Sequence, residues 1–140
     1  MDIKIVKTET DISKTWEVMH LLRPHLVAGE YVNLVMEMLS KGYNMAYIEE
    51  DGKAVSAVGF RELLFLYNGR HIYIDDLSTL DSHRGKGYGG LLVDYVKNLA
   101  KEKGYKQVTL DSGYGRHAAH RLYMNKGFIT SAHHFSVDVK

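Results

Sequence analysis

The chain has 140 residues, of which 45% are hydrophobic and 25% charged, a balance typical of one ordinary globular domain rather than of a disordered chain. Its formal net charge of +1 at pH 7 gives no argument for binding nucleic acid. The absence of cysteine excludes both a disulfide framework and a thiol nucleophile.

The chain also shows no sign of export or membrane insertion. Its first residues, Met1-Asp2-Ile3-Lys4, lack the charged-then-apolar pattern of a secretory leader. No run approaches the roughly 18 apolar residues that a membrane-spanning helix needs. We therefore expect a cytoplasmic protein with no membrane partner and no nucleic-acid partner.

The N-terminal part predicts one strand and two helices. Residues 2–7 alternate apolar and charged side chains, which is the period of a strand. Apolar residues then recur at helical spacing over 12–19 and again over 31–39. Pro24 separates these two helices, and Gly42 ends the second of them.

The middle of the chain predicts two hairpins. Asp51-Gly52 lies between the apolar runs 45–48 and 54–66, and Asn68-Gly69 lies between the second of these runs and 72–80. Both dipeptides suit two-residue turns, which require positive φ. Three consecutive antiparallel strands are therefore expected.

The last part alternates helices and strands. Residues 91–99 carry one apolar helix face, and Gly104 ends that helix. A short strand over 107–110, a helix over 116–126 and a final strand over 128–139 complete the prediction.

Together these elements predict a mixed α/β (α+β) fold in a single domain over 1–140. The order is β-α-α-β-β-β-α-β-α-β, so most of the sheet should be antiparallel, with helices flanking it. The unit over 72–110 is strand–helix–strand, which normally forms a right-handed parallel crossover. The sheet should therefore change from antiparallel to parallel pairing at this unit.

A glycine-rich loop is the sharpest feature of the sequence. The segment Arg84-Gly85-Lys86-Gly87-Tyr88-Gly89-Gly90 lies between a predicted strand and an amphipathic helix. Glycines allow the backbone to approach a ligand closely, and a helix start offers unpaired N–H groups to an anion. The loop therefore predicts a diphosphate site, although a flexible solvated turn is the alternative.

Three phosphate-binding patterns compete for this loop. The Walker pattern is absent, since no Gly-Lys-Ser/Thr occurs. The dinucleotide pattern G-x-G-x-x-G is present as Gly85, Gly87 and Gly90, but residues 81–84 separate its first glycine from the strand. A dinucleotide-dependent oxidoreductase, with Asp111 holding a ribose, remains the alternative. The third pattern, Arg/Gln-x-x-Gly-x-Gly/Ala, is matched over 84–89.

This third pattern resembles the acyl-CoA loop of the GCN5-related N-acetyltransferase superfamily. The segment Ala119-His120-Arg121-Leu122-Tyr123-Met124-Asn125-Lys126-Gly127-Phe128 resembles the second signature of that superfamily, a helix with Leu-Tyr followed by Gly-Phe. The element order is similar along almost the whole chain. The resemblance implies the acyl-CoA N-acyltransferase fold and transfer of acetyl from acetyl-CoA to an amine.

The resemblance also implies a set of cofactor-binding residues around the loop. One of them, Arg116, departs from the superfamily, where asparagine is common at this position, and an arginine there can pair with phosphates. The full set is Leu77, Ser78, Thr79, Arg84, Gly85, Lys86, Gly87, Tyr88, Gly89, Gly90 and Arg116.

Tyr123 stands where the superfamily has its general acid. The thiol formed from a departing thiolate has a pKa of about 8.5, and the phenol of tyrosine has a pKa of about 10. Proton donation from tyrosine to the thiolate is therefore chemically reasonable. The chain has ten tyrosines, however, and a packing role for Tyr123 is the alternative.

The attacking amine must be neutral, so a general base is expected. Asp76 is the first candidate and Asp111 the second, and a role in capping a loop or bulge is the alternative for either. Asp75 is expected on the opposite face of the strand. The apolar phase of the strand shifts between Ile74 and Leu77, which predicts a bulge whose free N–H groups can polarise a thioester carbonyl, with a simple strand end as the alternative.

The expected acceptor is a primary amine of a small molecule, entering beside residues 23–31 and attacking directly in a ternary complex. A non-catalytic acyl-CoA sensor of the same fold is the alternative. The eight histidines lack a recognisable ligand spacing, so no metal site is expected. The sequence leaves a homodimer open.

Overall fold

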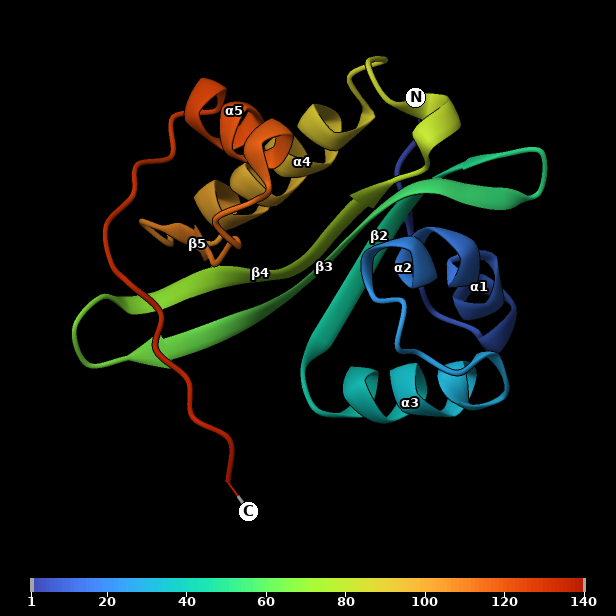
Figure 1. Cartoon of the computed structure of the whole chain (residues 1–140). Helices are drawn as coiled ribbons and strands as arrows, with labels where there is room; N and C mark the ends of the chain where they lie inside the picture. Colours follow the sequence, from blue (N-terminus) through green and yellow to red (C-terminus); the bar gives the residue numbers. More distant parts are fainter. Residues whose placement is uncertain (1, 140) are drawn as a thin grey trace. The chain divides into compact units, whose positions relative to one another are not determined.

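The computed structural model describes residues 2–139 in two compact units (Figure 1). The N-terminal unit ends at Leu110, and the C-terminal unit begins at Asp111. The sheet and four of the five α-helices belong to the first unit, and the fifth helix belongs to the second. Each unit is described by itself.

The N-terminal unit is built on a five-stranded sheet in the order β1-β2-β3-β4-β5. Neighbouring strands from β1 to β4 pair antiparallel, and β4 pairs with β5 in parallel. The predicted mixed α/β class and its change of pairing are therefore confirmed. The strands are β1 (Lys4–Ile5), β2 (Tyr43–Glu50), β3 (Lys53–Phe65), β4 (Gly69–Thr79) and β5 (Val108–Leu110).

Helices cover both faces of this sheet. The group α1–α3 packs on one face, here called the α3 face, and α4 packs on the other, here called the α4 face (Figure 1). Phe60 marks the α4 face, because its ring meets Tyr95 of α4 edge-on at 6.4 Å between centroids. The helices are α1 (Glu9–Lys14), α2 (Trp16–Leu22), α3 (Ala28–Ser40), α4 (Tyr88–Glu102) and, in the C-terminal unit, α5 (His117–Asn125).

The first predicted helix is divided in two at Thr15. The backbone N–H and the side-chain hydroxyl of Thr15 both donate to the carbonyl of Ile12, at 2.9 and 2.7 Å. This tight turn ends α1, and α2 begins at the next residue. The hydroxyl of Thr15 also lies 2.7 Å from that of Tyr31, which joins this break to α3.

The final strand predicted over 128–139 is wrong, because the structure assigns no strand to these residues. Phe135, Val137 and Val139 alternate as strand residues do, and all three are exposed. A strand needs a neighbour that pairs with its backbone groups, and local alternation does not supply one.

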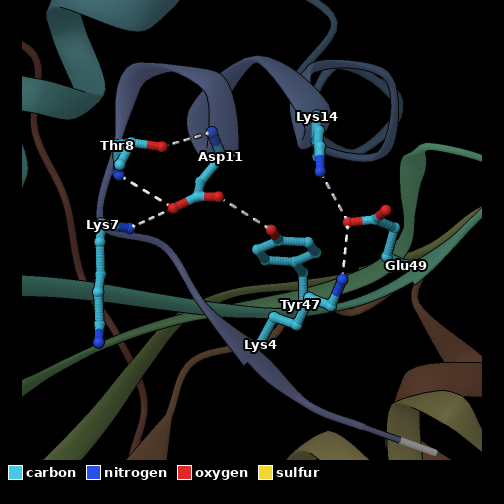
Figure 2. A network of polar contacts seen from close by, with 7 residues as sticks. All are labelled: Lys4, Lys7, Thr8, Asp11, Lys14, Tyr47 and Glu49. Carbon is cyan, nitrogen blue, oxygen red and sulfur yellow. Dashed lines mark hydrogen bonds and ion pairs between the residues drawn. The ribbon is translucent and has the colours of Figure 1, made fainter.

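A capping box fixes the start of α1 and ties it to β2 (Figure 2). The Thr8 hydroxyl accepts from the Asp11 N–H at 3.1 Å, and the Asp11 carboxylate accepts from the N–H groups of Thr8 and Lys7 at 3.0 and 2.9 Å. The Tyr47 hydroxyl also donates to Asp11, at 3.2 Å. The Lys7 N–H first, and the other donors with it, hold the pKa of Asp11 below its ordinary value. Figure 2 shows a second anchor, made by Lys4, Lys14 and Glu49.

We expect the buried Tyr31 to make the fold sensitive to alkali. Burial raises the pKa of Tyr31 from 10.0 to about 12. An unfolded tyrosine ionises near pH 10, so the stability linked to Tyr31 is complete below pH 10 and is lost as pH rises towards 12. The free energy of unfolding should fall by about 2–3 kcal/mol over this window on account of Tyr31. Urea unfolding at pH 8 and 12 measures it; an equal fall in Tyr31→Phe would contradict this assignment.

Candidate active site

A β-bulge interrupts β4 at Asp75. Phe60 of β3 pairs with Ile74, and the preceding Gly59 pairs with Asp76, so Asp75 has no partner of its own. The bulge predicted from the apolar pattern is therefore confirmed. One inserted residue reverses which side of the strand each later backbone group faces.

This reversal turns two backbone amides of β4 towards an open edge. Before the bulge, the N–H of Ile72 donates to Gln107, next to β5. After the bulge, the N–H of Leu80 donates to Val55 of β3. Backbone N–H groups alternate in direction along a strand, so the N–H groups of Leu77 and Thr79 point away from β3. Among residues 2–110, β5 pairs with β4 only over 72–74. The N–H groups of Leu77 and Thr79 are therefore available to a ligand.

The bulge also places both aspartates on the α3 face. Asp75 receives the Arg61 guanidinium, through Nε at 3.0 Å and Nη2 at 2.8 Å. The same guanidinium lies over the Tyr43 ring, 5.4 Å from its centroid. The expectation that Asp75 faces away from Asp76 is therefore wrong, because a bulge inserts a residue without restoring the alternation of faces. Burial raises the pKa of Asp75, and Arg61 opposes that rise.

Asp76 is held by two side chains from elements far apart in the sequence. Its Oδ1 accepts from Arg23, which precedes α3, at 3.0 Å from Nε and 2.9 Å from Nη2. Its Oδ2 accepts from the hydroxyl of Tyr43 at 2.7 Å. Burial first, and Asp76 next, raise the pKa of Tyr43 well above its ordinary value. Tyr43 therefore keeps its proton and acts as a donor to Asp76.

Gly59 makes room for Tyr43 to reach Asp76. A Cβ at Gly59 would lie 1.6 Å from the hydroxyl oxygen of Tyr43 and 2.4 Å from its Cζ. Gly59 has no positive φ, so space and not backbone conformation requires glycine at this position.

A cavity of about 290 Å³ opens beside Asp76 on the α3 face. The Arg23–Asp76 ion pair forms its polar end, His25 also lines it, and the rest of its wall is mostly apolar. It thus lies where the sequence predicted that the acceptor enters, beside residues 23–31 and the strand aspartates. The side chains that line it come from α2, α3, β2, β4 and the segment before α3.

The glycine-rich loop forms an open turn at the start of α4. Gly85 and Gly87 have φ of 81° and 84°, and a Cβ at either position would meet nothing within 4 Å. Gly87 is the N-cap, and the first turn bond runs from the N–H of Leu91 to its carbonyl. The N–H groups of Tyr88, Gly89 and Gly90 thus have no partner within the helix. Arg84 and Lys86 are exposed beside them, and Arg84 contacts Asp81 at 3.3 Å.

Glu50 of β2 fixes the start of α4, which sequence reasoning missed. Its carboxylate accepts from the hydroxyl of Tyr88 and lies 3.1 Å from Nε2 of His83. The hydroxyl of Tyr88 first, and His83 next, lower the pKa of Glu50. Residue 50 is 38 positions before Tyr88, so no local pattern points to this contact. It directs the Tyr88 ring towards β2 and leaves only its backbone N–H for a ligand.

In the C-terminal unit, the Gly-Phe pair positions Tyr123 within α5. Gly127 has φ of 90°, its N–H donates to Met124, and the N–H of Phe128 donates to the carbonyl of Tyr123 at 3.0 Å. This is a Schellman motif, whose usual apolar contact is made here by Phe128 and Tyr123, with ring centroids 5.9 Å apart. Burial raises the pKa of Tyr123, and Arg116 opposes that rise. Asp111, in the same unit, lies 3.5 Å from His134.

The decisive comparison is with a family model. The model described as "Acetyltransferase (GNAT) family" matches residues 13–128, which include the β4 bulge, the glycine-rich loop and the Gly-Phe signature. The chain belongs to the GNAT acetyltransferase family. The resemblance stated from the two sequence signatures is therefore confirmed, and with it the fold class.

One sequence relative agrees with this assignment, and solved structures share the fold. The chain is 30% identical over 135 residues to the "Uncharacterized N-acetyltransferase YhdJ" of Bacillus subtilis, with 95% of each chain covered. A putative acetyltransferase from Agrobacterium tumefaciens has a TM-score of 0.85 at 23% identity, over 99% of this chain and 100% of its own. The aminoglycoside N-acetyltransferase AAC(6')-Iy in complex with CoA has a TM-score of 0.85 at 14% identity, over 99% and 94%.

Three further observations concern metal sites, membrane-spanning helices and the dinucleotide pattern in this GNAT chain. Within residues 2–139, no group of three or more His, Asp or Glu side chains is arranged to hold a metal ion. No helix in that range is long and apolar enough to cross a membrane. The dinucleotide reading is weakened, because a 3₁₀ turn over Asp81–His83 separates the strand from Gly85.

A negative charge at Gly87 should weaken the binding of a ligand that carries a diphosphate, without unfolding the GNAT domain. Aspartate is a good N-cap and tolerates positive φ, so Gly87→Asp should fold. Its carboxylate would repel a diphosphate at the start of α4, and we expect about tenfold weaker CoA binding. Gly87→Asn has the same shape without the charge and is the matched control. Calorimetry with CoA measures both; equal affinities of the two variants would rule out an anion at this turn.

Proposed function

We propose that this chain transfers the acetyl group of acetyl-CoA to a primary amine of a small molecule, by direct attack within a ternary complex. Acetyl-CoA is the acetyl donor in this reaction and supplies an activated thioester. The residues of the chain bind and polarise it, orient the amine, and move one proton from the amine and one to the departing thiolate.

The observation that carries the proposal is that the N-terminal unit contains both a free edge of β4 and an open start of α4. The N–H groups of Leu77 and Thr79 face the β4 edge beyond the parallel pairing with β5. The polypeptide then passes directly from β4 through a 3₁₀ turn to the open turn at Gly87. A ligand with a diphosphate at one end and an amide-bearing arm suits both sets of donors.

The loop fits the diphosphate of CoA on three counts. Gly85 and Gly87 leave open space where a side chain would otherwise stand. The first N–H groups of α4 are unpaired within the helix, and the helix dipole favours an anion there. Lys86 adds an exposed positive charge. Ser78, Gly89 and Gly90 complete the binding residues proposed in this unit, with Arg116 in the other.

In this proposal the N–H of Leu77, freed by the bulge, donates to the thioester carbonyl. Such a donor stabilises the negative charge that develops on the oxygen when the amine attacks. Asp76 accepts an N–H of the amine and is the first candidate for its general base, directly or through water; Asp111 is the second. Tyr123 donates its phenolic proton to the departing thiolate.

Calorimetry and a thiol-release assay together test the proposal. We expect CoA and acetyl-CoA to bind, NAD not to bind, and free thiol to appear with an equal amount of acetylated amine. NAD binding without CoA binding would favour the dinucleotide-dependent oxidoreductase. CoA binding without turnover of any amine would favour an acyl-CoA sensor. A covalent acetyl-enzyme would contradict direct attack.

A further inference from the structure

The cavity beside Asp76 has one polar end and an apolar body. Met19, Val35 and Met45 form its buried wall. Leu34, Leu26 and Met38 complete the apolar lining. A ligand that fills this space must therefore bury an apolar group next to whatever it presents to Asp76.

The hydroxyls in the wall are already paired. Tyr43 donates to Asp76 at 2.7 Å, and the Tyr31 hydroxyl lies 2.7 Å from that of Thr15. Because the Thr15 hydroxyl donates to Ile12, the Tyr31 hydroxyl donates to Thr15, so both phenolic protons are used and neither phenol can donate to a sugar. A polyhydroxylated ligand would place polar groups against the apolar wall without partners, which costs free energy.

The carboxylates at and beside the polar end are matched by guanidinium groups, although only Arg23 and Asp76 of these groups line the cavity. Asp75 is paired with Arg61, and Asp76 with Arg23, so two carboxylates face two guanidinium groups. No surplus negative charge remains among these four groups to attract a polycation. Aminoglycosides and polyamines carry several positive charges and would gain no net attraction here.

Asp76 still has room for one more donor. A carboxylate oxygen has two acceptor positions. Oδ1 uses both on Arg23, whereas Oδ2 uses one on Tyr43. The second position of Oδ2 can accept one N–H of an amine without displacing Arg23. The side chain of Asp76 is 15% exposed, so it remains accessible from the cavity.

The volume sets the size of the ligand. At about 290 Å³ the cavity lies just below the roughly 300–1,000 Å³ typical of pockets for drug-sized ligands. It suits a body such as one phenyl ring or a short branched alkyl chain, together with the aminoalkyl group. A multi-ring aminoglycoside exceeds it.

We propose that this cavity binds the acceptor, and that the acceptor is a compact monoamine with an apolar body, of the arylalkylamine or branched alkylamine class. The amine donates to Oδ2 of Asp76, and its apolar body lies against Met19, Val35 and Met45. This inference rests on the proposed acetyl transfer and names the substrate class of the same site.

A substrate panel tests the class. The probes are phenethylamine and 3-methylbutylamine, with spermidine, neamine and L-phenylalanine as competitors of different charge. We expect kcat/KM for the two apolar monoamines to exceed that for spermidine and neamine by at least about tenfold. A preference for either polycation would overturn the class. A preference for L-phenylalanine over phenethylamine would also overturn the class, because it would mean that Arg23 binds the carboxylate of an amino acid.

A pair of variants on α3 tests whether the acceptor binds in this cavity. Leu34 lines the cavity and Met36 does not, yet the two residues are similarly exposed, at 42% and 41%. Leu34→Trp should fill part of the cavity and raise KM for phenethylamine about tenfold, with kcat little changed. Met36→Trp, the matched control, should leave KM within about twofold of the unmodified chain. Equal KM values for the two variants would place the acceptor elsewhere.

Direct binding separates this inference from the proposed function. Calorimetry in the presence of CoA should show phenethylamine binding to the unmodified chain and to Met36→Trp, and about tenfold weaker binding to Leu34→Trp. If phenethylamine binds in this pattern but is not acetylated, the substrate site stands and the acetyl transfer fails. If neamine or spermidine is acetylated and phenethylamine does not bind, the acetyl transfer stands and this inference fails.

Discussion

Replacing Tyr123 with Phe should lower kcat about 100-fold, the scale of a lost general acid. The change removes only the phenolic oxygen and keeps the ring that packs on Phe128. Burial raises the pKa of Tyr123 above its ordinary value of 10.0, so the hydroxyl carries its proton throughout the neutral range. Steady-state thiol release at pH 7–9 measures kcat and KM separately, and KM for acetyl-CoA should change little.

Tyr114→Phe is the matched control for this prediction. Tyr114 lies in the same unit, is 85% exposed, and contacts His133 only at 3.4 Å. We expect its kcat to stay within about twofold of the unmodified chain. If Tyr123→Phe retained full kcat, Tyr123 would be a packing residue and the proton would reach the thiolate from another group.

Replacing Gly59 of β3 with Ala should displace Tyr43 and thereby disturb Asp76. The added Cβ would lie 1.6 Å from the hydroxyl oxygen of Tyr43, so the ring must move and its hydrogen bond to Asp76 must break. Overpacking of this kind costs about 1–3 kcal/mol of the free energy of unfolding. Misplacing Asp76 should lower kcat/KM for the amine about 100-fold. Urea unfolding and steady-state kinetics measure the two effects.

Two further variants keep this prediction testable. Gly29→Ala, on α3, adds the same methyl group where nothing lies within 4 Å, and should be neutral or slightly stabilising. Tyr43→Phe removes the hydroxyl that donates to Asp76 and adds no volume, so it should lower kcat/KM about tenfold. It serves as the test of this contact if Gly59→Ala proves too unstable to assay. Unchanged kinetics in Tyr43→Phe would show that the Tyr43–Asp76 contact has no part in the reaction.

Local patterns in the sequence predicted those features whose causes are local. The Asp51-Gly52 pair predicted the two-residue turn between β2 and β3, because such pairs tolerate the positive φ that tight turns need. The hairpin of β3 and β4 was also predicted, but the two-residue turn at Asn68-Gly69 is wrong: Gly69 pairs with Phe65, so the loop is residues 66–68. The shift in apolar phase between Ile74 and Leu77 predicted the bulge, since an inserted residue must break the period of two.

Features that depend on distant partners could not be read from the sequence. Arg23 and Tyr43 reach Asp76 from segments 53 and 33 positions away, and Glu50 reaches Tyr88 over 38 positions. No spacing rule connects such residues. The predicted strand over 128–139 failed for a related reason, because its alternation is local whereas a strand depends on a neighbouring one.

The face of Asp75 was mispredicted for a different reason. The bulge itself was expected, but Asp75 was assigned by simple alternation as though the strand were regular. Two consecutive side chains can share a face at a bulge, and both Asp75 and Asp76 meet partners on the α3 face here. This shared face brings two carboxylates and two guanidinium groups together beside the cavity.

Amide chemical shifts on titration with CoA test the central claim most directly, namely that backbone N–H groups of one unit hold the diphosphate and the arm of this cosubstrate. In a ¹⁵N-labelled chain, we predict the largest shifts at the amides of residues 85–90 and at those of Leu77 and Thr79. Shifts confined to other regions, with these amides unmoved at saturation, would contradict the account.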